Sequence, residues 1–115
     1  MAVAALVSGC SPPPPQAVSV TLQCAAESHA LRQRCAVHVT DRRTGRGVAG
    51  ATVTLLADMP SMPLVHSLRP VTAVPDSPPG TYRGTLTLEM AGRWVVAVRI
   101  AGPVDDQSTH VIDAN

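Results

Sequence analysis

The sequence has 115 residues, of which 45% are hydrophobic and 15% charged, and its net charge is +1 at neutral pH. This length supports one domain with one modest core. The balanced charge and the presence of only one Trp, one Tyr and no Phe exclude a nucleic-acid surface built on basic residues and stacking rings. Eleven prolines and eight glycines interrupt the chain too often for long helices.

The N-terminus has the features of an export signal. An apolar run from Met1 ends in small residues, and the tetrad Val7-Ser8-Gly9-Cys10 resembles a lipobox, the bacterial motif that implies acylation of the cysteine and cleavage before it. We therefore predict that residues 1–10 are a lipoprotein signal peptide and that Cys10 is the lipid anchor. No Lys or Arg precedes Cys10 and the run is short, so we expect the true start codon to lie upstream. The alternative is a tail in which Cys10 occurs by chance.

Residues 11–16 separate this signal from the rest of the chain. They contain four consecutive prolines, Pro12 to Pro15, which favour an extended polyproline II conformation. Such a spacer would hold a folded domain, residues 17–115, away from its anchor. The sequence thus predicts a cell-envelope protein, extracytoplasmic and lipid-anchored to an inner or outer membrane. No apolar run reaches the ~18 residues that a membrane-spanning helix needs.

The two remaining cysteines, Cys24 and Cys35, lie at the end of one expected strand and the start of the next. An even number of cysteines in an exported domain favours a disulfide, which we predict here. The alternative is a pair of thiols that binds a metal ion, although their spacing is not that of a CxxC motif.

Alternation of apolar and polar residues recurs along the chain and predicts β-strands. The expected strands cover residues 18–23, 35–40, 52–55, an extended stretch at about 65–74, 82–89, 93–100 and about 108–112. Turns are expected at residues 41–47, 78–80 and 91–92, which are rich in Gly, Pro and Asp. About seven short antiparallel strands indicate an all-β fold, an immunoglobulin-like β-sandwich.

The strand expected at 93–100 has the most regular pattern, and Trp94 is its natural core residue. His38 alternates with two valines, so it is expected to face solvent. His29 lies in the hairpin between Cys24 and Cys35.

Residues 58–66 are the segment best suited to bind a ligand. Met59 and Met62 are three residues apart, and His66 follows four residues later. Thioethers suit Cu(I), and imidazole accepts either copper ion. Met90 and His110 are further candidates. The alternative is that the methionines fill gaps in an apolar core.

The order of motifs resembles the YtkA-like family, which is related to FixH-type proteins. The matching pieces cover about residues 17–101 and are Thr44-Gly45-Arg46-Gly47-Val48-Ala49-Gly50-Ala51, Met59-Pro60-Ser61-Met62, Pro79-Gly80-Thr81-Tyr82 and Met90-Ala91-Gly92-Arg93-Trp94. The resemblance implies an exported or membrane-attached immunoglobulin-like domain, and several members are associated with copper or cation handling. Carried over, it makes Met59, Met62 and His66 the metal ligands. The sequence departs from the family in having Pro63-Leu64 where members tend to have Gly and often a further Met.

No enzyme motif is present: the sequence has no G-x-S-x-G elbow, no H-E-x-x-H and no phosphate-binding glycine loop. We expect Asp105, Asp106, Asp41 and Asp58 to cap turns or face solvent rather than to form a carboxylate site. Two functions follow. The first is a membrane-anchored domain that binds copper in support of an oxidase or pump. The second is a structural or interaction module without its own ligand, which binds an envelope membrane protein.

Overall fold

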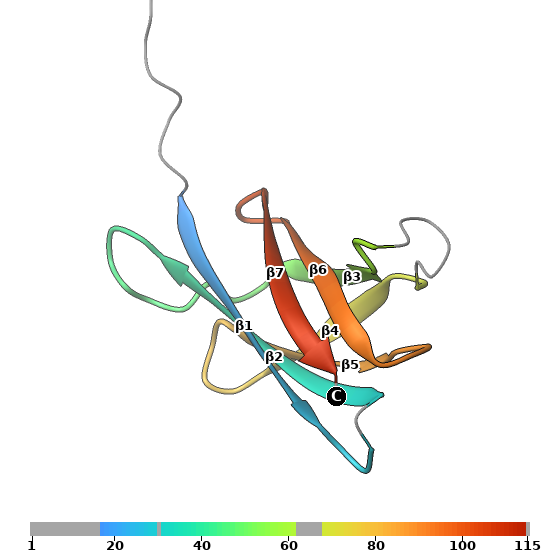
Figure 1. Cartoon of the computed structure of the whole chain (residues 1–115). Helices are drawn as coiled ribbons and strands as arrows, with labels where there is room; N and C mark the ends of the chain where they lie inside the picture. Colours follow the sequence, from blue (N-terminus) through green and yellow to red (C-terminus); the bar gives the residue numbers. More distant parts are fainter. Residues whose placement is uncertain (1–16, 30, 62–67, 115) are drawn as a thin grey trace, which may run out of the picture.

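The structure is a computed structural model that describes residues 17–29, 31–61 and 68–114. Seven strands make up its regular structure (Figure 1), and they are β1 (Val18–Ala26), β2 (Arg32–Asp41), β3 (Thr52–Asp58), β4 (Val71–Asp76), β5 (Thr81–Thr87), β6 (Gly92–Ala101) and β7 (Asp106–Ala114). The all-β prediction is confirmed. Among the described residues no helix is long and apolar enough to cross a bilayer.

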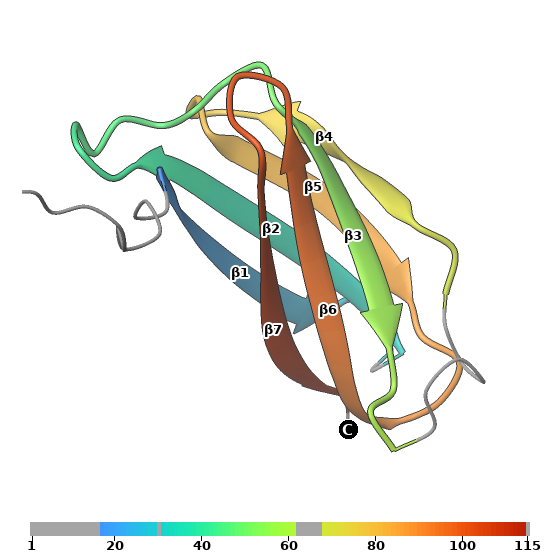
Figure 2. The same ribbon diagram turned by 90° about the horizontal axis from the view of Figure 1, so that it is seen from above.

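Every strand pairing is antiparallel, in the order β1-β2-β5-β4-β3-β6-β7. Strand β4 changes partner midway, because residues 71–73 pair with β3 and residues 74–76 pair with β5. The sheet therefore folds over at β4 into two facing layers, β1-β2-β5 and β3-β6-β7 (Figure 2). This arrangement is a β-sandwich closed by β4 along one side, with β1 and β7 as the terminal strands along the other.

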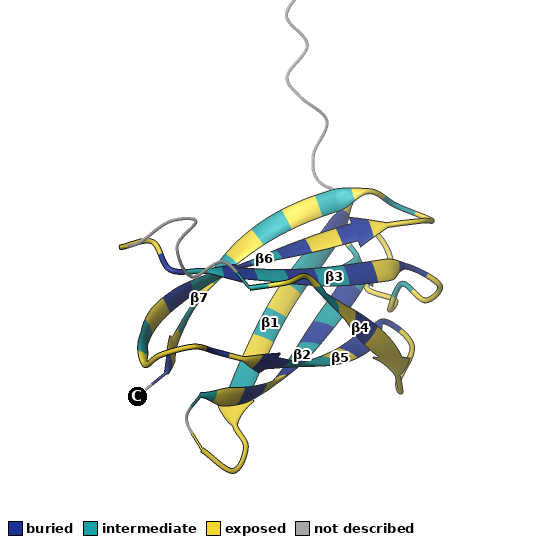
Figure 3. Ribbon diagram, turned by 90° about the vertical axis from the view of Figure 1, so that its right-hand side faces the viewer, coloured by how far each residue is buried: buried dark blue, intermediate teal, exposed yellow. Residues whose placement is uncertain are grey.

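The apolar core lies between the two layers. Burial alternates along each central strand (Figure 3), as a period of two requires when one face packs inward. Val53, Leu55, Val96 and Val98 are fully buried. Trp94 is also fully buried, as predicted, and its indole Nε1 donates to the backbone carbonyl of Met90 at 3.0 Å. The largest apolar side chain of the core thus has its polar atom satisfied.

The predicted disulfide between Cys24 and Cys35 is confirmed. The two residues lie directly opposite each other in β1 and β2. Their side chains point into the space between the layers, where Cys35 is buried. Because the bond closes a short loop, its chain-entropy contribution is about 2–3 kcal/mol.

Two glycines allow the turn after β2 to pack against the turn before β5. A Cβ on Gly47 would lie 1.8 Å from the carbonyl oxygen of Pro79. Gly80, at φ +94°, has the Cα of Gly47 2.6 Å from where its own Cβ would be. Backbone contacts this close permit only glycine at both positions.

Tyr82, on β5, forms hydrogen bonds that hold the long connection between β2 and β3 against its own strand. Its hydroxyl donates to the carbonyl of Val48 at 2.7 Å and accepts from the N–H of Ala51 at 3.1 Å. The ring is buried, so these bonds satisfy a phenol that is otherwise surrounded by core.

The boundaries of the fourth strand differ from the expectation. The expected stretch of about 65–74 lies partly outside the described residues, and β4 begins at Val71 and continues through Pro75 to Asp76. A proline is disfavoured inside a strand because it has no N–H to donate. Here it stands where β4 has left β3 and pairs only with β5, opposite Tyr82. The prediction ended the strand too early because this exchange of partners has no local signal.

A charge in the core of β6 should be strongly destabilising. Val96 is fully buried, so Val96→Asp places a carboxylate where it has no solvent, and we expect a loss of roughly 3–5 kcal/mol in the free energy of unfolding by denaturant titration. The matched control is Val111→Asp on neighbouring β7, where the side chain is 59% exposed, and a loss under about 0.5 kcal/mol is expected. Equal losses of unfolding free energy in the two variants would contradict the two-layer arrangement of the β-sandwich.

Candidate functional site

Met59 directly follows β3, and its side chain is only 5% exposed. Its N–H donates to Asp58 Oδ1 at 2.9 Å, which holds the backbone where the strand ends. The thioether methyl lies against Gly92 at the start of β6, since a Cβ at Gly92 would be 3.1 Å from Met59 Cε. Met59 therefore packs at the boundary of the core rather than projecting from a loop.

Met90 lies at the same end of the sandwich. It belongs to the turn between β5 and β6, two residues before Gly92, and is 36% exposed. Its carbonyl accepts the hydrogen bond from Trp94, which ties this turn to the core. We call Met59, Met90 and the turn 88–91 the methionine end. Met90, a further candidate ligand from the sequence, thus precedes by two residues the glycine that Met59 contacts.

The other two predicted copper ligands, Met62 and His66, lie outside the described residues, as does the predicted anchor Cys10. In the part of the chain that the structure describes, no group of three or more His, Cys, Asp or Glu side chains could hold a metal ion.

The remaining histidines are spread over the molecule. His29 is exposed in the hairpin between β1 and β2. His38 is on the outer face of β2, but it is half-buried rather than open to solvent, because the Thr81 hydroxyl lies 3.3 Å from its Nδ1. His110 is half-buried on β7, with Nε2 2.8 Å from Ser108 Oγ.

The aspartates cap turns, as expected. The Asp41 carboxylate accepts from the N–H groups of Thr44 and Arg43, which lowers its pKa below the ordinary value. Asp105 accepts from Gly102 at 3.3 Å, and Asp106 accepts from Gln107 at 2.8 Å. Each of these carboxylates accepts a hydrogen bond from a nearby backbone N–H.

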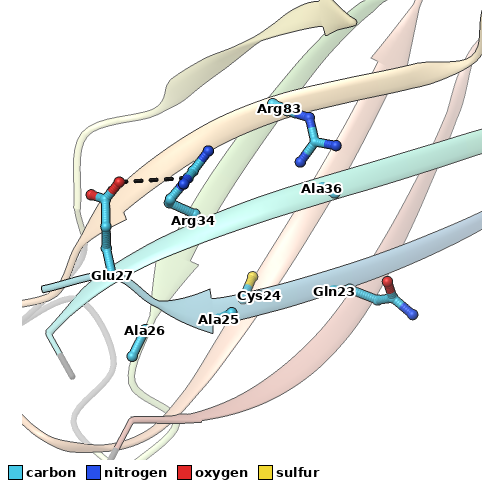
Figure 4. Close-up of a pocket in the computed structure, with 8 residues that line it drawn as sticks. All are labelled: Gln23, Cys24, Ala25, Ala26, Glu27, Arg34, Ala36 and Arg83. Atoms are coloured by element: carbon cyan, nitrogen blue, oxygen red, sulfur yellow. Dashed lines mark ion pairs between the residues drawn. The ribbon is translucent and has the colours of Figure 1, made fainter. Parts of the chain in front are cut away.

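A depression that the sequence did not predict lies on the outer face of β1, β2 and β5 (Figure 4). It has a volume of about 570 Å³ and is lined by Gln23, Cys24, Ala25, Ala26, Glu27, Arg34, Ala36 and Arg83. Small Ala36 lies between Gln23 and Arg83 on the neighbouring strands, which creates the hollow. Sequence reasoning missed it because these residues become neighbours only through strand pairing.

The charges around this depression are largely paired. Glu27 forms ion pairs with Arg32 at 2.6 Å and with Arg34 at 3.5 Å. Arg83 pairs with Asp76, whose pKa is lowered first by the N–H of Ser77 and second by this arginine. The depression therefore offers no strong net charge to a ligand.

A family model described as YtkA-like matches residues 14–99. The chain belongs to the YtkA-like family. No curated protein matches it.

The structure gives physical reasons for several motifs shared with the YtkA-like family. The Gly47–Gly80 contact and the Tyr82 hydroxyl join the Thr44–Ala51 segment to the Pro79–Tyr82 segment. The Met90 carbonyl and the Trp94 indole close the turn before β6. These motifs maintain the fold, and none of these contacts requires a ligand.

His110 should make stability depend on pH. Partial burial lowers its pKa below the ordinary value of 6.5 because desolvation disfavours the charged form. The unfolded chain then binds the proton more readily than the folded one, so stability is full above pH 6.5 and falls as pH drops through that value toward the lower folded pKa. We expect His110→Gln to flatten this part of the curve of unfolding free energy against pH, measured by urea titrations. If the His110 variant kept the wild-type slope of unfolding free energy against pH, this role of His110 would be contradicted.

Proposed function

We propose that this YtkA-like domain is an extracytoplasmic lipoprotein, held at a membrane through acylated Cys10, and that its methionine end binds Cu(I). The lipobox-like tetrad, the proline spacer and family membership support the anchored location. The Cys24–Cys35 disulfide supports an oxidising compartment. The proposal assigns no catalytic role to any residue.

One observation carries the copper proposal: Met59 and Met90, from separate parts of the chain, both lie at one end of the sandwich. The methyl group of Met59, after β3, lies against Gly92, and Met90 precedes Gly92 by two residues in the turn before β6. Met62 and His66 follow Met59 by three and seven residues in the sequence. The donor set proposed is thioether sulfur from Met59 and Met62 with imidazole nitrogen from His66. Soft sulfur with one imidazole suits Cu(I) better than hard cations.

A second candidate function is an interaction module without its own ligand. The burial of Met59 favours it, because a methyl group packed against Gly92 is what a core-filling methionine shows. Such a module would bind an envelope membrane protein through its surface or through β1 or β7, the terminal strands of the sheet.

The anchor is tested by expressing the full chain in a bacterium with a basic leader placed before Met1. We expect mass spectrometry of the membrane fraction to find an N-terminal peptide that begins at Cys10 and carries diacylglycerol. Cys10→Ser should remain unacylated and leave the membrane fraction. Wild-type protein that keeps residues 1–9 and lacks lipid would refute the anchor.

Copper binding is tested by competition of the purified chain with a coloured Cu(I) chelator, with ascorbate as a reductant that spares the disulfide. We expect saturable binding of one Cu(I) ion, weakened more than about tenfold in Met59→Leu/Met62→Leu and in His66→Gln. Leucine preserves the volume of buried Met59, so the fold should survive. His29→Gln, an exposed histidine elsewhere, is the matched control and should bind normally. Absence of saturable Cu(I) binding in the wild-type protein would refute the copper proposal and leave the interaction module as the remaining candidate function.

A further inference from the structure

The turn that follows β2 places three arginines beside the point where the chain leaves the domain toward its N-terminus. The N–H of Arg42 donates to the carbonyl of Ala17 at 3.1 Å, and its Nε donates to the carbonyl of Val18 at 3.2 Å. Arg43 and Arg46 are exposed on the same turn. Figures 1 and 2 both show this turn next to the start of β1. We call residues 41–47 the basic tip.

The basic tip concentrates the positive charge of the molecule. It contains three arginines and one aspartate, a net charge of +2, whereas the whole chain carries +1, so the rest of the chain is net −1. Four other arginines form ion pairs with carboxylates: Arg32 and Arg34 with Glu27, Arg83 with Asp76 and Arg93 with Asp113. The exposed Arg43 and Arg46 of the tip are therefore the strongest candidates for contact with an anionic partner.

Three acidic residues lie near the tip, where Arg43 and Arg46 are exposed. Asp41 lies within the turn, and its carboxylate is occupied by the N–H groups of Arg43 and Thr44. Asp105, on the connection between β6 and β7, and Asp106, the first residue of β7, lie at the same end of the sandwich but belong to the other layer. The basic surface is thus confined to the layer from which the N-terminal tether departs.

We propose that the basic tip rests on the anionic phospholipid surface to which the chain is anchored and so orients the domain. This inference depends on the lipid anchor proposed above. Between Cys10 and Ala17 the chain has six residues, which span at most about 20 Å even when fully extended. Because the tether leaves beside Arg42, anchoring brings the tip to the headgroups before any other part of the domain. One lipid signal combined with basic residues holds a protein at a membrane better than either alone.

The tip and the anchor can be tested separately because the disulfide leaves Cys10 as the remaining thiol. Alkylating Cys10 of the full purified chain with a tetradecyl maleimide supplies one weak anchor, whether or not the cell acylates this residue. Binding is then measured by sedimentation with vesicles of phosphatidylcholine alone or with about 30% phosphatidylglycerol. Each arginine at an anionic surface should contribute about fivefold in affinity at low ionic strength.

We expect wild type to prefer the anionic vesicles and to lose that preference in about 0.5 M NaCl. Arg43→Gln/Arg46→Gln should weaken binding to anionic vesicles about 25-fold and leave binding to neutral vesicles unchanged. Arg42 is kept because it contacts Ala17 and Val18. The matched control is Arg69→Gln/Arg99→Gln, which removes the same charge from exposed sites outside the tip and should cost less than about twofold.

Equal losses in the two double variants would overturn the proposal, since they would show an effect of net charge alone. Wild type without a preference for anionic vesicles would also overturn it and would direct attention to an acidic protein as the partner of the tip. Unfolding curves of both variants should match wild type, since none of the four side chains is buried. If the tip variants behave as expected but Cys10 is unmodified in cells, the lipid-anchor proposal is refuted, whereas the affinity of the basic tip for anionic phospholipid is not.

Discussion

Burial of the alternating apolar faces between two layers is the constraint on which the rest of this molecule depends. Trp94 is fully buried there, and its one polar atom is satisfied by a carbonyl in the turn just before its own strand. Val53, Leu55, Val96 and Val98 surround the same space. With no phenylalanine available, the core depends on close packing of β-branched side chains around this single indole and Tyr82. Small changes of volume or charge in this core should therefore affect the stability of the whole domain.

The two layers are joined by β4, which pairs first with β3 and then with β5. The antiparallel strands of both layers run between the two ends of the sandwich. At one end lie the start of β1, the basic tip and the Gly47–Gly80 contact; at the other lie the end of β3, the turn before β6 and the methionine end. The antiparallel register keeps these ends apart, as Figure 2 shows.

That separation gives the two proposals a common geometry. If the basic tip faces the headgroups, the methionine end faces away from the membrane, toward whatever delivers or accepts copper. A short proline spacer suits this arrangement because it limits how far the domain can turn from the surface. The interaction module would use the same orientation and present the edges of β1 and β7 along the membrane normal.

The local pattern of residues was enough to predict the class of fold, the number of strands, the burial of Trp94 and the disulfide. Each depends on a short-range signal: period-two alternation, a large apolar side chain within it, and an even pair of cysteines on adjacent strands. The turn-capping role of the aspartates could be predicted for the same reason, since their donors lie within three residues. Family membership could likewise be anticipated from the order of short motifs.

Only the tertiary structure determined which residues and strands are neighbours in space. The exchange of partners in β4, the depression around Ala36 and the burial of Met59 against Gly92 all depend on residues far apart in the sequence. The same holds for the basic tip, where Arg42 contacts Ala17 and Val18 across the β1–β2 pair. Strand register and layer packing set such neighbours, and both result from the cooperative burial of the whole core. A sequence pattern specifies which face of a strand turns inward, but not which strand meets it there.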